Sequence, residues 1–438
     1  MINFHDYLTA HMGISPEVTQ FIQQIENSAD LKKIYDLADQ TAAVNQAKVL
    51  HAMQSCRLSD THFNDSTGYG YHDEGREALE AVFAHIFKAE AALVRPQLIS
   101  GTHALAAALF GNLRPGDTLL SPVGAPYDTL ESVIGIRPAA GSLAEYGVAY
   151  QQVVLTENGG FDYPAIKKAL SDCLRNTQKP VKMVTIQRSK GYAWRPSFTM
   201  HQIAELIQCI RTESPNTIIM VDNCYGEFVE TIEPIEAGAD IIAGSLIKNP
   251  GGGLAPGGGY VVGKSEYVEN AATRLTAPGL GSAVGPSLGM TRNLLQGLFL
   301  APQTVSACIK GAVLAAATFE KLGFDVLPRC DEMRTDIVQA IKLGSEENIL
   351  SFCKGIQKAA PVDSFVTPEP APMPGYAHGV VMAGGTFIQG SSIELSADAP
   401  MRPPYIVYFQ GGLTASHSMA GVIFALDAMV KDGRVLLD

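Results

Sequence analysis

Two lysines within one glycine-rich stretch could each carry a different chemistry. The stretch from Ser245 to Ser265 reads SLIKNPGGGLAPGGGYVVGKS. Lys248 ends an apolar run and opens a glycine-rich turn. Because burial disfavours an ammonium group, we expect a lowered lysine pKa and a nucleophilic amine at this position. Lys264 ends the segment GGYVVGKS, which fits the phosphate-loop pattern G-x-x-x-x-G-K-[ST].

The sequence context differs between the two lysines. A phosphate loop follows a strand and has a flexible middle. The middle of GGYVVGKS is Tyr-Val-Val, which is typical of a strand, and the preceding LAPGGG is not strand-like. This context favours Lys248 as the catalytic lysine. A nucleotide-binding α/β protein that uses Lys264 is the remote alternative.

Other polar side chains also follow strand-like runs. Asp222 comes directly after TIIMV, Tyr127 follows TLLSPV, and Arg188 follows KMVTIQ. The turn 100–102 opens the helix-like run THALAAALFGN, where free backbone N–H groups suit a phosphate. Each group alone has an ordinary interpretation as a helix cap, a turn residue or a surface residue. Ligands of open α/β sheets collect outside the carboxyl ends of the strands, so we expect these groups to converge with Lys248.

The elements that must position these residues alternate between strands and helices from about residue 91. Several runs, such as TIIMV and DIIAGSLI, are apolar on both faces, which is typical of strands in a covered parallel sheet. This alternation predicts a doubly wound, mostly parallel α/β domain. We predict a helical arm at 1–60, this large domain at 61–300 and a smaller α+β domain at 301–438.

Charge and hydropathy exclude several classes of protein. The net charge of -12 argues against a nucleic-acid-binding or acidic-membrane-binding surface. The start MINFHDYLTAHMG lacks the features of a signal peptide. The apolar region 294–316 is interrupted by Gln296, Pro302 and Lys310, so we expect a buried helix rather than a membrane span.

The cysteines and histidines give little sign of a metal site. The seven cysteines are scattered and form no CxxC pair, which indicates free thiols and a cytoplasmic protein. The nearest approach to a cluster is His51, Cys56 and His62, whose spacing matches no metal-site signature. We therefore predict no metal site.

Four segments together resemble those of a known enzyme family. They read STGYGYHDEGREALE, QRSKGYAWRPS, VDNCYGEFVE and SLIKNPGGGLAPGGGYVVG. The chain resembles fold-type I pyridoxal-phosphate enzymes, within them the cystathionine and methionine γ-lyase-like branch, and within that branch the aluminium-resistance proteins. The resemblance implies the pyridoxal-phosphate-dependent transferase-like fold, with pyridoxal 5'-phosphate as cofactor.

The resemblance implies a role for each candidate residue. Lys248 would bind the cofactor covalently and then act as the base. Asp222 would pair with the pyridine nitrogen, and Tyr127 would stack on the ring. The other implied cofactor residues are Ser100, Gly101, Thr102, Tyr225 and Ser245.

Two further implied sites involve the partner subunit and the substrate. In the broader branch a Tyr-x-Arg segment from the neighbouring subunit reaches the phosphate. Here the matching residues are Tyr69 and Tyr71, with tyrosine in place of arginine, and Arg76 is the candidate replacement for the missing charge. Arg402 resembles the arginine that binds the substrate carboxylate, and Arg188 is a second candidate.

The implied function is elimination from a sulfur-containing amino acid. A carbon–sulfur lyase of this kind acts on a cystathionine, methionine or cysteine type of substrate, by α,β- or α,γ-elimination. The sequence does not distinguish these reactions, and an aminotransferase on the same fold is the alternative. The resemblance also implies a homo-oligomer, a dimer or tetramer, with active sites shared between subunits.

Overall fold

The computed structural model describes residues 2–376 and 378–437 of the chain. The chain divides into two compact units. The large unit contains residues 45–299, and the composite unit combines residues 1–44 with the residues from 300 onward. The predicted division into an arm, a large domain and a small domain stays a prediction, as does contact between the arm and a partner subunit.

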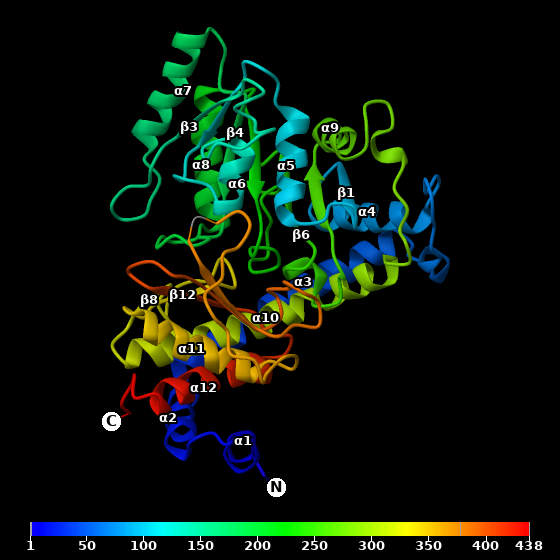
Figure 1. Cartoon of the computed structure of the whole chain (residues 1–438). Coiled ribbons are helices and arrows are strands. Elements are labelled where there is room, and N and C mark those ends of the chain that lie inside the picture. Colours follow the sequence, from blue (N-terminus) through cyan, green and yellow to red (C-terminus); the bar gives the residue numbers. More distant parts are fainter. Residues whose placement is uncertain (1, 377, 438) are drawn as a thin grey trace. The chain divides into compact units, whose positions relative to one another are not determined.

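The large unit is built on a seven-stranded sheet (Figure 1) with the strand order β1-β7-β6-β5-β4-β2-β3. β7 pairs antiparallel with β1 and β6, and the other neighbouring strands are parallel. The predicted mostly parallel sheet is confirmed. The strands are β1 (Ala91–Arg95), β2 (Thr118–Ser121), β3 (Ala149–Gln152), β4 (Met183–Gln187), β5 (Ile218–Asp222), β6 (Ile241–Ser245) and β7 (Gly259–Gly263).

The register of the parallel strands gathers their carboxyl ends at one edge of the sheet. Gln187 at the end of β4 lies opposite Asp222 at the end of β5. Asp222 lies in turn opposite Ala243 of β6, two residues before Ser245. Side chains that follow β4, β5 and β6 therefore leave the sheet at the same edge.

Helices of the large unit cover the sheet and set the positions of its loops. α5, α6 and α9 pack their apolar residues against the strands in one continuous core, and Figure 1 shows α5 beside α9. A Cβ on Gly111 of α5 would lie 2.6 Å from the carbonyl oxygen of Asn270 in α9, so only glycine permits this close helix packing. The helices are α4 (Glu74–Ile86), α5 (Gly101–Asn112), α6 (Asp128–Ile134), α7 (Tyr163–Thr177), α8 (Met200–Glu213) and α9 (Ser265–Leu275), with short 3₁₀ turns at Asp60–Phe63, Asn249–Gly251 and Gly281–Ala283.

The composite unit contains a separate antiparallel sheet with the order β10-β11-β12-β9-β8. Its helices α11 and α12 pack against each other, and α11 also contacts β10 and β11. The smaller α+β region expected near the end of the sequence is present. The elements are β8 (Asp325–Leu327), β9 (Gln339–Lys342), β10 (Val380–Ala383), β11 (Ser396–Pro400), β12 (Ile406–Gln410), α11 (Glu346–Ala359) and α12 (Ala415–Lys431).

The N-terminal helices α1 (Phe4–Met12) and α2 (Pro16–Glu26) belong to the composite unit. The segment between them makes hydrogen bonds with α12. The backbone N–H and hydroxyl of Ser15 donate to Asp427 Oδ1 at 2.9 and 2.7 Å. Lys431 Nζ donates to the Gly13 carbonyl at 2.6 Å. Two long helices, α3 (Ala29–Ser55) and α10 (Thr291–Lys321), contribute residues to both units.

The α10 helix is long and apolar enough to cross a membrane by length and composition alone. Its apolar window is 78% buried inside the protein, as in the core helix of a soluble protein, and Pro302 lies within it. The expectation of a buried helix in this region is met. Location in the cytoplasm stays a prediction.

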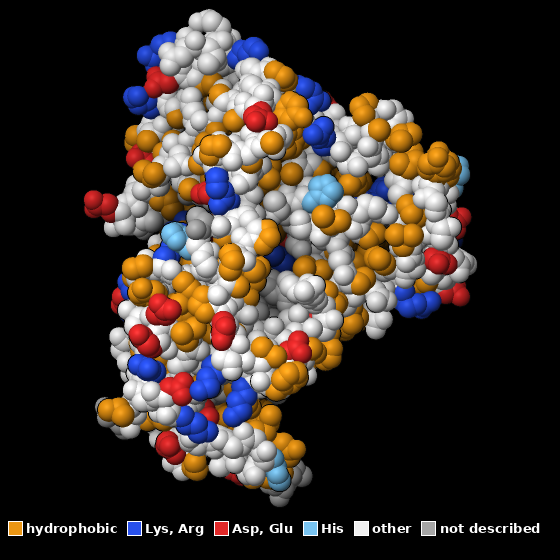
Figure 2. Space-filling view, viewed as in Figure 1, with side chains coloured by type: hydrophobic (Ala, Val, Ile, Leu, Met, Phe, Trp, Pro, Cys, Tyr) orange, Lys and Arg blue, Asp and Glu red, His pale blue; other side chains and the backbone are white. Residues whose placement is uncertain are grey.

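Acidic and basic side chains are mixed over the face drawn in Figure 2. Lys and Arg side chains there lie among Asp and Glu side chains. The absence of a nucleic-acid or membrane partner stays a prediction.

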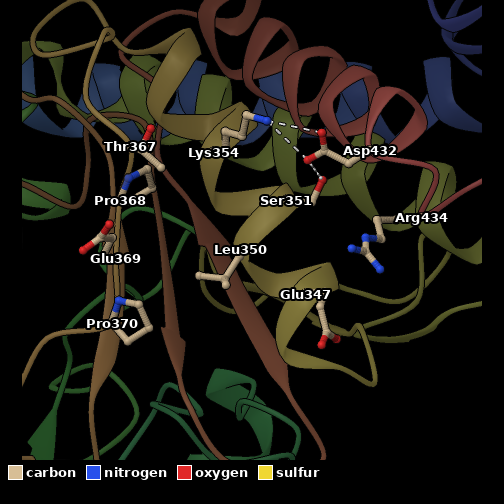
Figure 3. A pocket seen from close by; sticks show the side chains of 10 residues that line it. All are labelled: Glu347, Leu350, Ser351, Lys354, Thr367, Pro368, Glu369, Pro370, Asp432 and Arg434. Carbon is tan, nitrogen blue, oxygen red and sulfur yellow. Dashed lines mark hydrogen bonds and ion pairs between the residues drawn. The ribbon is translucent and has the colours of Figure 1, made fainter.

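A surface hollow of about 710 Å³ lies within the composite unit (Figure 3). Residues 367–370 form part of its wall, and Lys354 of α11 points toward Asp432, with 3.2 Å between Nζ and Oδ1. None of the residues predicted to bind cofactor or substrate lines this hollow.

Candidate active site

Lys248 lies in the turn that follows β6, at the carboxyl edge of the large sheet. Its Nζ lies 4.0 Å from the centroid of the Tyr225 ring, which projects from the loop after β5. Tyr225 has a left-handed backbone (φ 69°), a conformation that is uncommon for a residue other than glycine. The loop after β5 therefore brings an aromatic ring onto the lysine that the sequence predicts to be catalytic.

The electrostatics of Lys248 differ from the sequence expectation. Burial lowers its pKa, but the nearby acidic groups outweigh burial and hold the pKa above its ordinary value; these groups are Cys224, Tyr225, Asp222 and Glu227. The expected lowering was therefore wrong. Burial also raises the pKa of the neighbouring acidic groups Asp222, Cys224 and Glu227. The sequence did not show that these groups lie beside the lysine. The amine must lose a proton before it can act as a nucleophile or base.

Asp222 ends β5 in a buried position close to Lys248. Burial raises the pKa of its carboxyl group, and the charge of Lys248 opposes that rise. Asp222 Oδ1 accepts a hydrogen bond of 3.1 Å from the backbone N–H of Cys224, which fixes the carboxylate at the start of the loop. Asp222 and Lys248 therefore form a coupled buried pair of opposite charge.

The N-terminus of α5 packs against the same edge of the sheet. A Cβ on Gly101 would lie 3.1 Å from Ser245 Cβ and 3.5 Å from Cys224 Sγ, so glycine lets the helix approach both loops. Ser100 caps the helix by accepting from the His103 N–H at 3.1 Å. The Thr102 hydroxyl lies 2.8 Å from the Thr129 hydroxyl of α6. Free helix N–H groups and hydroxyls thus lie together where a phosphate can be held.

Tyr127 precedes α6 and is half-buried against the loop after β4. Its ring centroid lies 5.4 Å from that of Tyr192. A Cβ on Gly191 would lie 3.0 Å from Tyr127 Cδ2, and the φ of Gly191 is 57°. The glycine therefore leaves the space that the Tyr127 ring occupies.

Arg188 is placed differently from the sequence expectation of a substrate-binding residue. Its guanidinium is fully buried and donates to Asn223 Oδ1 at 2.9 Å, to the Gly226 carbonyl at 2.8 Å and to Glu230 Oε1 at 2.9 Å. Glu233 Oε2 lies 3.7 Å away. Arg188 thus fixes the loop after β5, and the carboxylates of Glu230 and Glu233 balance its charge.

Tyr69 and Tyr71 are exposed, with side chains 71% and 60% accessible, and their rings stack at 5.5 Å. The backbone carbonyl of Tyr69 accepts from the Gly285 N–H at 2.9 Å. Arg76 donates to the carbonyls of Gly70 and Gly285 at 2.6 and 3.0 Å. The guanidinium of Arg76 is buried and holds this loop. Its role as the replacement charge at the phosphate stays a prediction.

Arg402 belongs to the composite unit, in the turn between β11 and β12, and is half-buried. Its role at the substrate carboxylate stays a prediction.

Lys264 occupies the position before the first residue of α9, directly after β7, and its side chain does not cap the helix. β7 is antiparallel to β6, and Gly263 pairs with Ile241 at the start of β6. Lys264 therefore lies at the opposite edge of the sheet from Lys248. Its side chain is 53% exposed and pairs with Asp240 Oδ1 at 2.8 Å, and that hydrogen bond raises its pKa.

Comparison with known proteins places the chain in a family. Residues 18–430 match the family model described as methionine gamma-lyase. The chain belongs to the methionine gamma-lyase family. The family resemblance predicted from the sequence is confirmed.

Relatives of the family are similar over nearly their whole length. The chain is 50% identical to the Bacillus subtilis protein YnbB over 93% of this chain and 96% of that protein. A Clostridium novyi protein named as a carbon-sulfur lyase involved in aluminium resistance is 46% identical, with a TM-score of 0.91 over 98% and 99% of the two chains. A Listeria monocytogenes protein, named as a candidate cystathionine beta-lyase involved in aluminium resistance, is 50% identical, with a TM-score of 0.88 over 93% and 98%.

A more distant structure shows the same fold. The pyridoxal-5'-phosphate-dependent protein YhfS of Escherichia coli is 16% identical, with a TM-score of 0.59 over 90% of this chain and 97% of that chain. The predicted fold-type I architecture is therefore confirmed. Family membership and the names of the near relatives support a pyridoxal-phosphate-dependent carbon–sulfur lyase, as the sequence predicted.

The site of this methionine gamma-lyase family member fits pyridoxal 5'-phosphate. The N-terminus of α5 at Gly101 lies against Ser245, and Thr102 adds a hydroxyl for the phosphate. Lys248 can react with the aldehyde, and the buried Asp222 carboxyl can pair with the ring nitrogen. The phosphate, the aldehyde and the ring nitrogen of the cofactor thus each have a matching group at this edge. Among residues 2–376 and 378–437, no three His, Cys, Asp or Glu side chains are grouped to hold a metal ion.

The sequence reasoning missed Cys224, Glu227 and Gly191. Cys224 and Glu227 lie in the quoted segment VDNCYGEFVE, on either side of Tyr225. An acid so soon after a buried strand signalled a buried carboxyl group. Gly191 lies in QRSKGYAWRPS, and only the contact with Tyr127 shows why glycine is needed there.

We expect Arg188→Met to destabilise the protein by about 3–5 kcal/mol, because it leaves Glu230 and Glu233 without their buried partner. Chemical denaturation measures the free energy of unfolding. The matched control is Arg175→Met, which removes an exposed arginine of α7 and should change stability by about 0.5 kcal/mol or less. An Arg188→Met protein of normal stability with a raised KM would restore the substrate-binding role.

Proposed function

We propose that this chain is a pyridoxal-phosphate-dependent lyase that uses Lys248 to cleave the carbon–sulfur bond of a sulfur-containing amino acid. The observation that carries the proposal is the meeting of three groups at one sheet edge. These are the partly buried Lys248, the buried Asp222 and the α5 N-terminus at Gly101, which packs on Ser245. The names of the near relatives support the class of bond that is cleaved.

The residues divide the chemical work among them. When bound, the cofactor supplies a ring that accepts the electron pair left on the substrate Cα. Lys248, as a neutral amine, takes the proton from Cα. Asp222 holds a proton at the ring nitrogen, and Tyr127 orients the ring. The carbon–sulfur bond then breaks and the thiol leaves. The enamine product, once released, reacts with water to give a keto acid and ammonia.

The reaction class can be tested with a panel of sulfur amino acids. Keto acid, ammonia and free thiol are measured together for cystathionine, methionine and cysteine. We expect all three products in equal amounts from at least one substrate. Keto acid without ammonia or thiol would indicate an aminotransferase instead.

Lys248→Ala should lose the visible absorption of the bound cofactor and nearly all turnover, because it removes the amine that the turn after β6 brings beside Asp222. Lys264→Ala is the matched control: its side chain is exposed and at the other edge, so absorption and turnover should persist. Absorption spectra and a peptide map after borohydride reduction measure both effects. Reduction that labels the Lys264 peptide would disprove the assignment.

Asp222→Asn should keep the cofactor bound but slow turnover by about two orders of magnitude or more, because an amide cannot hold a proton on the ring nitrogen by charge. The control is Asp172→Asn on α7, a partly exposed carboxylate away from the sheet edge that pairs with Lys168 and Arg175 of the same helix. Steady-state kinetics and the cofactor spectrum are compared for both variants. Near-normal turnover of Asp222→Asn would make Asp222 a structural residue only.

We propose further that the enzyme is a dimer or tetramer in which Tyr69 and Tyr71 enter the partner's active site. A stacked, exposed pair of aromatic rings on a loop fixed by Arg76 supports this proposal, because exposed aromatic surface is typical of contact sites. Arg402 is proposed to bind the substrate carboxylate, since a guanidinium matches its geometry.

Light scattering of the wild-type chain should give a dimer or larger. Tyr71→Ala and Lys248→Ala should each be inactive, and mixing them should restore part of the activity, because a mixed dimer holds one site with both residues. Tyr146→Ala, which removes another exposed tyrosine, should remain active and oligomeric. A fully active monomer would disprove the shared site.

A further inference from the structure

Glu227 is a fully buried carboxylic acid in the loop that presents Tyr225 to Lys248. Its Oε1 lies 2.6 Å from the hydroxyl of Tyr260, and its Oε2 has no hydrogen-bond partner in the described chain. Its backbone carbonyl accepts from Asn249 Nδ2 at 2.9 Å, and Asn249 directly follows Lys248. This hydrogen bond joins the backbone of Glu227 to the turn that carries Lys248.

The partner of Glu227 is fixed by its own surroundings. Tyr260 of β7 is fully buried, and its ring lies 5.9 Å from Phe83 and 5.8 Å from Phe87, centroid to centroid. A Cβ on Gly244 would lie 2.6 Å from the Tyr260 hydroxyl, so the glycine of β6 makes room for this hydroxyl. The packing of the two phenylalanines and the space beside Gly244 therefore hold the Glu227–Tyr260 pair in place next to the end of β6.

The charge of Glu227 depends on pH in the neutral range. Burial raises its pKa to about 8, which the hydrogen bond from Tyr260 and the charge of Lys248 oppose and the charge of Glu233 supports. Cys224 is the remaining titratable neighbour, and burial raises its thiol pKa well above the ordinary value. Glu227 is therefore mostly neutral at pH 7 and negative above pH 8, where Cys224 remains neutral.

We propose that Glu227 is a positioning residue for Lys248: together with Tyr260 it forms a buried acid that holds or releases one proton and so sets the charge facing the Lys248 nitrogen. This role rests on the proposed function, in which Lys248 must be neutral to take the Cα proton. Neutral Glu227 leaves Asp222 as the nearby charge that favours the lysine ammonium. Ionised Glu227 adds a second negative charge. This charge stabilises the protonated form of the Lys248 nitrogen, and a protonated lysine cannot act as the base.

The test is a pH titration of the visible absorption of the full-length protein with bound cofactor, which reports protonation at the Lys248 nitrogen. We expect Glu227→Gln to move the midpoint to lower pH, because a neutral amide no longer stabilises the positive charge. Coupled groups titrate as a pair, so wild type should also show a step near pH 8 that the variant lacks. The control is Glu205→Gln on α8, an exposed carboxylate whose loss should leave the curve unchanged.

A second variant keeps the proposal testable if Glu227→Gln folds poorly. Tyr260→Phe removes the hydrogen bond that stabilises the carboxylate, so Glu227 should ionise at higher pH and the step should move upward. Both variants should keep the cofactor bound. Titration curves of Glu227→Gln and Tyr260→Phe that superimpose on wild type would overturn the proposal.

Stability against pH gives an independent readout. The pKa of Glu227 rises from 4.5 to about 8 on folding, so the folded protein binds more protons than the unfolded chain between these values. The contribution of Glu227 to stability therefore falls as the pH rises through this window and is constant above it. Relative to wild type, Glu227→Gln should gain melting temperature from pH 5 to pH 8. A constant difference would contradict a titrating Glu227.

The experiment separates this inference from the proposed function. If Lys248→Ala keeps covalent cofactor, the assignment of the catalytic lysine fails whatever Glu227 does. If Lys248→Ala loses the cofactor and Glu227→Gln titrates like wild type, the function stands and the role of Glu227 fails.

Discussion

The balance of buried charge around Lys248 is the constraint on which the rest of the site depends. Removing an ion from water costs several kcal/mol unless an opposite charge and hydrogen bonds compensate. Here the lysine amine faces Asp222, whose carboxylate is held by the Cys224 N–H, and the face of the Tyr225 ring. Burial raises the pKa of Asp222, and the charge of Lys248 opposes that rise. Replacing either residue therefore changes the pKa of the other.

This charge balance explains the conformation of the loop after β5. Tyr225 and Phe228 both have positive φ, at 69° and 64°, a strain of about 1–3 kcal/mol for each such residue. Contacts of the loop offset that strain. Asn45 of α3 donates to the carbonyls of Phe228 and Glu230 at 2.9 and 3.1 Å, and Arg188 holds Gly226 from the other side. These contacts hold the strained loop in the position where the Tyr225 ring and the carboxyl groups of Asp222 and Glu227 lie near Lys248.

The sequence predicted the large sheet well because β2, β5, β6 and β7 are buried at every residue, as is typical of strands that are covered on both faces. The same reasoning placed Asp222 and Lys248 at one edge, since parallel strands that lie side by side end together. It did not predict the full burial of Arg188, because a position after a strand does not show whether a guanidinium faces a ligand or carboxylates of the same protein. It also failed for the pKa of Lys248, since the net charge near a buried group depends on long-range contacts such as that between Glu227 and Tyr260.

The rival lysine shows why a matching motif needs its structural context. A phosphate loop works because its backbone N–H groups are free to face the phosphate. Val261 and Val262 are fully buried in β7, and β7 is paired on one side with β1 and on the other with β6. Its backbone is therefore committed to the sheet at the middle of the matched pattern. The reversed direction of β7 then carries Lys264 to the edge away from Asp222 and the N-terminus of α5, where it binds Asp240. The antiparallel strand thus separates two lysines that lie close in sequence, and only Lys248 stays with the groups that suit the cofactor.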